Sequence, residues 1–248
     1  MTRTARFVSL AAAVAGLVAP LTAFHAQKDE RPLVAITQFY NSSIGKDARD
    51  YDGLSKGIPS FLITDMQPNP NIRVLERDQV QALIDEQKLV TGGQVDQATA
   101  VKIGKLLGVH HMIWGTYITD PRGRFRIDAK AVSVETGEIE YVERVNDKAD
   151  NIMTSIGMLA SKMNTGMHLP PMPALRTRDA SPPPGAQQAA APAPTPKLPM
   201  RVALLYGKAL DMIDHGEKGK ALELFNAVLK EFPSYQPANA EKTKLKGI

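Results

Sequence analysis

The stretch from Ile72 to Tyr117 constrains the fold more than any other part of the chain, because two strand patterns enclose two helical ones. Ile72, Val74 and Leu75 form an apolar, β-branched run that favours a partly buried strand. Two short helices are predicted next, followed by a second strand over residues 109–118. No catalytic motif falls in this stretch, so its pattern predicts packing.

The first of these helices is predicted to begin at Asp78. Asp78 and Gln81 have the spacing of an N-cap residue and its capping-box partner. Val80, Leu83 and Ile84 then recur at helical spacing. We therefore expect these three side chains to face the core.

The second helix is predicted to begin after an N-cap at Asp96. Gly108 follows its last turn, where a residue with positive φ commonly ends a helix. Trp114, in the strand that follows, is expected in the core. The residues expected on the buried face of this helix are Ala100, Ile103, Leu106 and Leu107.

On the N-terminal side, residues 33–40 (LVAITQFY) predict the first strand of the sheet. Apolar residues at helical spacing from Leu54 to Met66 then predict a helix. Pro59 is expected in or near its first turn, because a missing N–H costs least there.

On the C-terminal side, the pattern predicts a hairpin and a closing helix. Residues 124–131 alternate between charged and apolar, so one face of this strand is expected to be solvated and the other buried. Thr136 and Gly137 form the predicted turn to a strand over 139–145. The last helix carries an apolar stripe of Ile152, Ile156, Leu159 and Met163. The predicted fold is α/β, with a mixed sheet flanked by helices.

A change of composition follows at residues 166–199, which hold ten of the 18 prolines. Such a segment is typical of a disordered or polyproline-like linker. It separates the predicted α/β domain, residues 27–165, from a helical segment, residues 200–248. We expect the two to fold independently.

The segment 200–248 resembles one tetratricopeptide repeat in the spacing of Gly216, Ala221, Phe225 and Pro233. One helical pair hides only part of its apolar stripes. The segment after Pro237, the α/β domain, a second copy or a partner protein could cover the rest. The candidate partner-binding residues are Leu205, Ala209, Phe225 and Val228.

Residues 1–26 have the pattern of a secretory signal peptide, with Arg3 and Arg6 before an apolar run and Ala26 as a possible cleavage position. An uncleaved membrane anchor is the alternative, and either places the remainder outside the cytoplasm. The chain has no cysteine, which excludes disulfides, thiolate metal sites and lipid attachment at a leader cysteine. The predicted location is the periplasm, with membrane association only through partners or an uncleaved leader.

Charge and titratable residues predict no enzyme and no nucleic-acid binding. The net charge is +4, and the basic residues are interleaved with acidic ones. His110 and His111 are adjacent on a predicted strand and point to opposite faces, so they cannot bind one ion. Glu135, Glu138 and Glu140 surround a turn and are expected to be solvated. We therefore predict no catalytic, metal-binding or cofactor-binding residues.

Residues 32–163 resemble the periplasmic domain of the curli-assembly (CsgG-type) family, and through it the LpoB-type synthase activators and TolB-like N-terminal domains. The resemblance is carried by the order LERDQVQALIDEQ, KIGKLLGV, WGTYI and AVSVETGEI, and is sharpest at 75–77 and 136–138. It implies a fold more than a function, because one fold hosts many functions.

The resemblance implies a non-enzymatic periplasmic assembly or adaptor protein in envelope biogenesis or secretion. Its partners would be envelope or secretion proteins, with a homo-oligomer possible. A regulator that docks on a peptidoglycan synthase is the alternative. A secretion-channel subunit is disfavoured, because a membrane hairpin needs strands of about 9 to 11 residues and TDPRGR after residue 118 is a tight turn.

Overall fold

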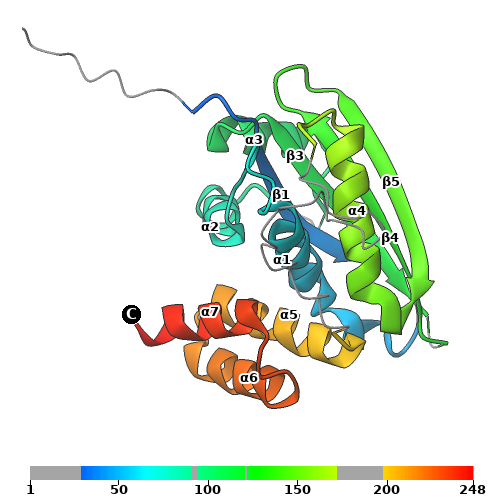
Figure 1. The fold of residues 1–248 in the computed structure, drawn as a ribbon, viewed down its shortest axis with the longest axis vertical. Coiled ribbons are helices and arrows are strands. Elements are labelled where there is room, and N and C mark those ends of the chain that lie inside the picture. The colour runs from blue at the N-terminus through cyan, green and yellow to red at the C-terminus, as the bar shows by residue number, and fades with distance from the viewer. Residues whose placement is uncertain (1–28, 91–93, 121, 172–197, 248) are drawn as a thin grey trace, which may run out of the picture. The chain divides into compact units, whose positions relative to one another are not determined.

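A five-stranded mixed sheet in the order β2-β1-β3-β4-β5 carries the fold (Figure 1). β2, β1 and β3 run parallel, and β4 and β5 continue the sheet antiparallel. The computed structural model describes residues 29–90, 94–120, 122–171 and 198–247, of which those from Arg31 onward form one compact unit. The strands are β1 (Leu33–Asn41), β2 (Arg73–Val74), β3 (His111–Thr119), β4 (Arg124–Ser133) and β5 (Ile139–Lys148).

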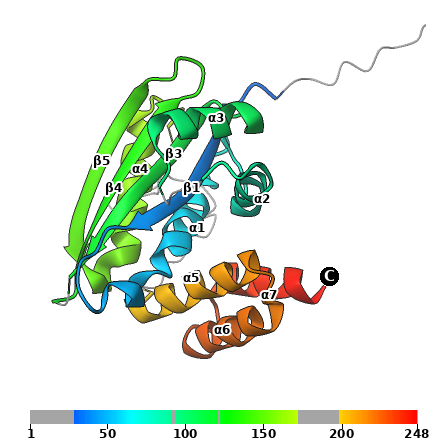
Figure 2. The ribbon, with the colours of Figure 1, turned by 180° about the vertical axis from the view of Figure 1, so that it is seen from behind.

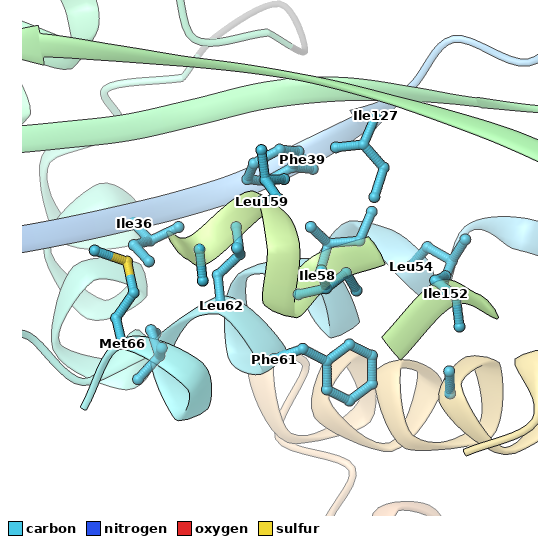
Figure 3. Packing of buried hydrophobic residues seen from close by; sticks show 14 of the residues in the cluster. Ile36, Phe39, Leu54, Ile58, Phe61, Leu62, Met66, Ile127, Ile152 and Leu159 are labelled. Carbon is cyan, nitrogen blue, oxygen red and sulfur yellow. The ribbon is translucent and has the colours of Figure 1, made fainter. Parts of the chain in front are cut away.

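Two helices, α1 (Leu54–Met66) and α4 (Ile152–Gly166), cover one face of the sheet. Figure 3 shows Ile58 and Leu62 of α1 beside Leu159 of α4, below Phe39 and Ile127 of the sheet. All five side chains are fully buried. The predicted stripe of α4 is confirmed, since its four members are all buried in this core. Short 3₁₀ turns, η1 (Ala48–Tyr51) and η2 (Ala149–Asn151), precede the two helices.

The opposite face of the sheet is covered only in part. α2 (Arg77–Gln87) and α3 (Gln97–Leu107) pack over β1 and β3, where a second core contains Trp114, Met112 and Ile103. Figure 2 shows α3 over the β1 and β3 side of the sheet, whereas no helix of the described part of the chain lies over the faces of β4 and β5 turned toward the viewer.

The ends of the two short helices test the predicted caps. Asp96 is confirmed as an N-cap, because its carboxylate accepts the Thr99 N–H at 2.8 Å. Gly108 ends α3 with φ of 66°. Asp78 was the wrong N-cap, since α2 begins at Arg77 after Glu76 and Asp78 instead accepts from the Arg77 guanidinium at 2.7 Å. An ion pair with its neighbour thus replaces the expected bond to the backbone.

Other helix predictions need smaller corrections. Pro59 lies inside α1, beyond its first turn, and is buried there. Leu83 is only half-buried, because α2 packs through Val80 and Ile84. Leu106 is 51% exposed, since α3 turns Ala100 and Ile103 to the sheet instead.

Three further helices, α5 (Met200–Asp214), α6 (Lys218–Glu231) and α7 (Gln236–Lys246), lie in the last described range, residues 198–247. α5 packs on α1, and α6 and α7 pack behind it. Their buried side chains belong to the same core as those of α1 and α4. The expectation that this segment is decoupled from the α/β domain is therefore contradicted by a shared hydrophobic core.

The predicted linker, residues 166–199, falls mostly outside the described residues. At its edges, Met167, Leu169 and Leu198 are buried in the core. Asn69 and Asn164 both donate side-chain hydrogen bonds to the Pro170 carbonyl, at 2.8 and 3.0 Å. The packed chain therefore extends four residues past α4, to Pro170.

Candidate functional site

The residues predicted for partner binding lie mainly in the core. Ala209, Phe225 and Val228 are fully buried, and Leu205 packs half-buried at its margin. The Tyr206 ring lies 5.8 Å from that of Phe225 and 5.4 Å from that of Tyr235, which precedes α7. The apolar stripes are therefore covered by α1, which belongs to the α/β domain, and by the segment after Pro237, whose Ala238 is buried in the same core. These are two of the coverings that the sequence left open. The partner-binding role of these four residues stays a prediction.

α5 approaches α1 at backbone distance. A Cβ at Gly207 would lie 1.8 Å from the Gly53 carbonyl oxygen, so only glycine fits at that position. Beside this contact, the ring of Phe61 stacks on Tyr206 at 5.5 Å between centroids, and Figure 3 shows Phe61 pointing from α1 toward α5. The Tyr206 hydroxyl and Ser60 Oγ are 3.1 Å apart. This contact is built to hold two helices together.

A buried ion cluster closes the same contact. Asp214, the last residue of α5, accepts from Arg77 Nη1 at 2.9 and 2.8 Å and pairs with Lys56 Nζ at 2.9 Å. The three side chains are only 9–10% exposed. Lys56 also donates to Gln81 Oε1 at 2.9 Å. Because these side chains are buried, a ligand cannot reach them, and their role is structural.

The two adjacent histidines, His110 directly before β3 and His111 as its first residue, have different partners. Leu33 donates its N–H to His110 Nδ1 at 2.9 Å. His111 Nδ1 lies 2.7 Å from Glu140 Oε1. The prediction that Glu140 is merely solvated is thus wrong, because its side chain is only 20% exposed and is paired with His111. Each histidine therefore has a local structural partner.

The candidate functional site is the face of β3, β4 and β5 that no helix among the described residues covers. Strand register brings Thr116 of β3, Asp128 of β4 and Arg144 of β5 into one row across it. The next rows are Trp114, Lys130 and Val142, and Ile118, Arg126 and Asn146. We call the side chains of these three rows, apart from the buried Trp114, the open face.

One carboxylate organises the centre of the open face. Asp128 accepts from Arg126 Nε at 2.6 Å and from Arg144 Nε at 2.7 Å. Burial opposes ionisation of Asp128, but the hydrogen bonds from the two arginines prevail and hold its pKa below the usual range. Asp128 is 17% exposed, whereas Arg126 and Arg144 are 40% and 59% exposed. The carboxylate therefore lies beneath two exposed guanidinium groups.

Both guanidinium groups retain donors for a ligand. Within the described chain, each arginine reaches Asp128 through Nε, and its two terminal nitrogens are not used in that bond. A guanidinium carries five N–H donors in a planar fork that matches carboxylate and phosphate oxygens. The pair is thus oriented by Asp128 and open to an anion.

A hollow of about 420 Å³ continues the open face toward one end of the sheet. It lies where the turn from β3 to β4 meets the end of β5. Asp120 pairs there with Arg124 at 2.7 Å and shapes the turn by accepting the N–H groups of Arg122 and Arg124. The lining side chains include Ile118, Arg124, Arg126, Asn146 and Lys148. Cations and an apolar wall therefore share this hollow.

The sequence predicted half of this site. Alternation over residues 124–131 predicted a solvated face with Arg126, Asp128 and Lys130, and the structure confirms it. Arg144 was missed, because only the register of β4 with β5 places it opposite Asp128. Side chains along residues 139–146 point alternately to the two faces of the sheet, and this alternation was the signal that could have placed Arg144 on the open face.

Among residues 29–90, 94–120, 122–171 and 198–247, no group of three or more His, Cys, Asp or Glu side chains is arranged to hold a metal ion. Over the same described ranges, no helix combines the length and apolarity needed to cross a bilayer.

Part of the sheet that carries the open face matches a known protein family. Residues 22–120 match the family model of the curli production assembly/transport component CsgG. The match covers less than half of the chain, including β1, α1 to α3 and β3. No curated protein matches the sequence.

Similarities to solved structures extend over about half of the chain. The LpoB C-terminal domain from Salmonella enterica is 12% identical, covers 47% of this chain and 82% of its own, and has a TM-score of 0.36. For lipoprotein GNA1162 from Neisseria meningitidis the values are 13%, 55%, 96% and 0.39. For the PelC dodecamer from Paraburkholderia phytofirmans they are 11%, 56%, 89% and 0.35. Likenesses of this size carry no information on partners.

Proposed function

We propose that this protein is a non-enzymatic assembly or adaptor protein of the cell envelope, of curli-assembly type, acting in secretion or envelope biogenesis. The observation that carries the proposal is the family-model match over residues 22–120. That match includes the parallel half of the sheet and the helices that cover it, so it concerns the packed framework of the domain.

The arrangement of the surface supports a binding role. Among the described residues, no helix covers one half of this sheet face, and this half presents Arg126 and Arg144. Exposed arginine beside apolar side chains is typical of protein interfaces. In contrast, α5 packs on α1, α6 packs on α5 and α7 packs on α6, so the C-terminal helices enlarge the scaffold.

Affinity purification of the full chain from envelope extracts, after mild crosslinking, tests the proposal. We expect enrichment of proteins of a secretion or envelope-assembly machine over an unrelated bait with the same tag. Capture of a peptidoglycan synthase instead would favour the alternative, a synthase regulator. Recovery of no envelope protein, together with turnover in a hydrolase screen, would overturn the adaptor role.

Cell fractionation tests the location. A periplasmic adaptor is expected in the fraction released by osmotic shock, and the N-terminus of the released protein would begin near residue 27. Recovery with the membranes after a high-salt wash would indicate an uncleaved leader, and recovery in the cytoplasm would contradict the proposal.

A further inference from the structure

We propose that the open face binds an acidic, extended segment of a partner protein, which lies along the edge strand β5 and places carboxylates on Arg126 and Arg144. The inference rests on the proposed adaptor function and names the chemistry of the partner. Three features of the described residues carry it: the oriented arginines, the free edge of β5, and the mixture of charge with apolar side chains.

The arginines define the chemistry of the ligand. Asp128 fixes both guanidinium groups through Nε, which removes much of the side-chain entropy that an anion would otherwise have to overcome. Each group can then receive a carboxylate by two parallel hydrogen bonds. Asp128 neutralises the charge of only one of the two arginines, so the two arginines and Asp128 together carry a net positive charge.

The edge strand defines the shape of the ligand. β5 has ten residues and is an end strand of the described sheet. A segment that pairs with such an edge gains main-chain hydrogen bonds and sets alternate side chains on one face. Side chains directly opposite on neighbouring strands lie about 5 Å apart. An acidic residue opposite Arg144 would therefore reach its guanidinium.

The apolar neighbours favour a polypeptide over a nucleic acid or a lipid surface. Val142 is 54% exposed and Ile118 is 36% exposed, on either side of the arginine pair. Alternating acidic and apolar residues would match both. A dense phosphate array would instead meet the carboxylates of Asp120 and Asp128 among these cations.

Charge also favours a partner over a second copy of this chain. Across the middle rows of the open face, the cations Arg126, Lys130 and Arg144 outnumber the single carboxylate of Asp128. A copy would present the same positive surplus, and like charges brought together oppose association. An acidic segment removes the surplus.

The test uses the full chain and a synthetic ten-residue peptide in which Glu and Val alternate, with a Gln and Val peptide for comparison. We expect the Glu peptide to bind and the Gln peptide to bind at least about tenfold more weakly, since charge-assisted hydrogen bonds are lost. Binding should weaken as salt is raised.

Matched variants locate the peptide. Arg126→Gln and Arg144→Gln should each weaken binding of the Glu peptide by about tenfold or more. Arg144→Lys should restore only part of it, because lysine keeps the charge and loses the fork. Arg201→Gln is the control, because Arg201 lies on α5, is 79% exposed, and is not part of the open face. Its binding should equal that of the parent.

Several outcomes overturn the inference. Equal binding of the two peptides, or unchanged binding by both arginine variants, would remove the carboxylate site. Stronger binding of single-stranded DNA or of phosphatidylglycerol vesicles than of the Glu peptide would assign the face to another class of partner. Self-association in sedimentation that Arg144→Gln alters would assign it to a second copy.

The two proposals can fail separately. If the parent captures an envelope protein and Arg144→Gln captures it equally, the adaptor function stands and this surface is not its site. If the Glu peptide binds through the arginines but no envelope protein is captured, the surface chemistry stands and the adaptor function is wrong.

Discussion

Two aspartates in this protein are each shared by two cations, and they differ in their surroundings. Asp214 pairs with Lys56 and Arg77 between three helices, where the side chains are 9–10% exposed. Asp128 pairs with Arg126 and Arg144 on the open face, where the arginines are 40% and 59% exposed. The chemistry is alike, and burial decides its use: the first cluster fastens α5 to the domain, whereas the second holds its cations ready for a ligand.

The physical basis of this difference is desolvation. Ions removed from water lose hydration that only good partners can replace, so loss of one buried partner leaves a large penalty. On the surface, water replaces a lost partner and the net effect is small. Matched substitutions at the two clusters should therefore have unequal effects on stability and can break or sharpen the comparison.

The largest effect is expected for Asp214→Asn. It leaves Lys56 as a buried cation without a carboxylate and Arg77 with only the half-exposed Asp78, and it should destabilise folding by about 3–5 kcal/mol. Asp211→Asn, one turn earlier on α5 with a 39% exposed side chain, should cost less than about 1 kcal/mol. Urea unfolding followed by circular dichroism measures both. Equal losses would show that burial does not distinguish the two aspartates.

Gly207→Ala should have the next largest effect. Its new methyl group would meet the Gly53 carbonyl, which belongs to the backbone and cannot rotate away, so we expect a loss of about 1–3 kcal/mol or more. Gly219→Ala on α6 is the control, because its Cβ meets open space, and it should stabilise the helix by up to about 1 kcal/mol. Hydrogen exchange along α5 should increase only in the first variant. Unchanged exchange would mean that the helices can separate slightly at no cost.

A third aspartate tests burial without a cation. Burial raises the pKa of Asp65 from 3.8 to about 6, so the folded protein binds this proton more tightly than the unfolded chain. Stability should therefore fall as pH rises from about 4 through 6. Asp65→Asn removes this loss, and we expect it to stabilise the protein at pH 7 by at most about 3 kcal/mol and to have little effect near pH 4. Thermal unfolding at both pH values measures this, and an equal effect at the two would contradict the burial argument.

The smallest effect on stability is expected for Asp128→Asn. Water can solvate Arg126 and Arg144 after the change, so the loss should be below about 1 kcal/mol. The same urea experiment measures it, with the parent as reference. A loss above about 2 kcal/mol would place the Asp128 cluster among the structural ion pairs and weaken the reading of the open face as a binding surface.

The sequence by itself determined the local elements, because helices and strands impose short periods on apolar residues. The stripe of α4, the N-cap at Asp96, the left-handed Gly108 and the buried Trp114 could all be predicted. Asp78 shows the limit of such signals, because a capping pattern competes with an ion pair to a neighbour. Leu83 and Leu106 show another limit of such signals. A short helix can be rotated about its axis by different amounts and still place apolar residues inward.

Only the tertiary structure decided how distant segments meet. Asp214 reaches Lys56 and Arg77, which lie more than 130 residues earlier, and no local period encodes that contact. The meeting of Gly53 with Gly207 depends on the docking of α5 on α1, and Phe225 is buried where α6 packs on α5. Arg144 joins Asp128 through strand register, which a bulge between Ala131 and Val132 shifts along β5. Sequence periodicity records which face of an element is apolar, whereas the partner of that face is chosen by packing and desolvation over the whole chain.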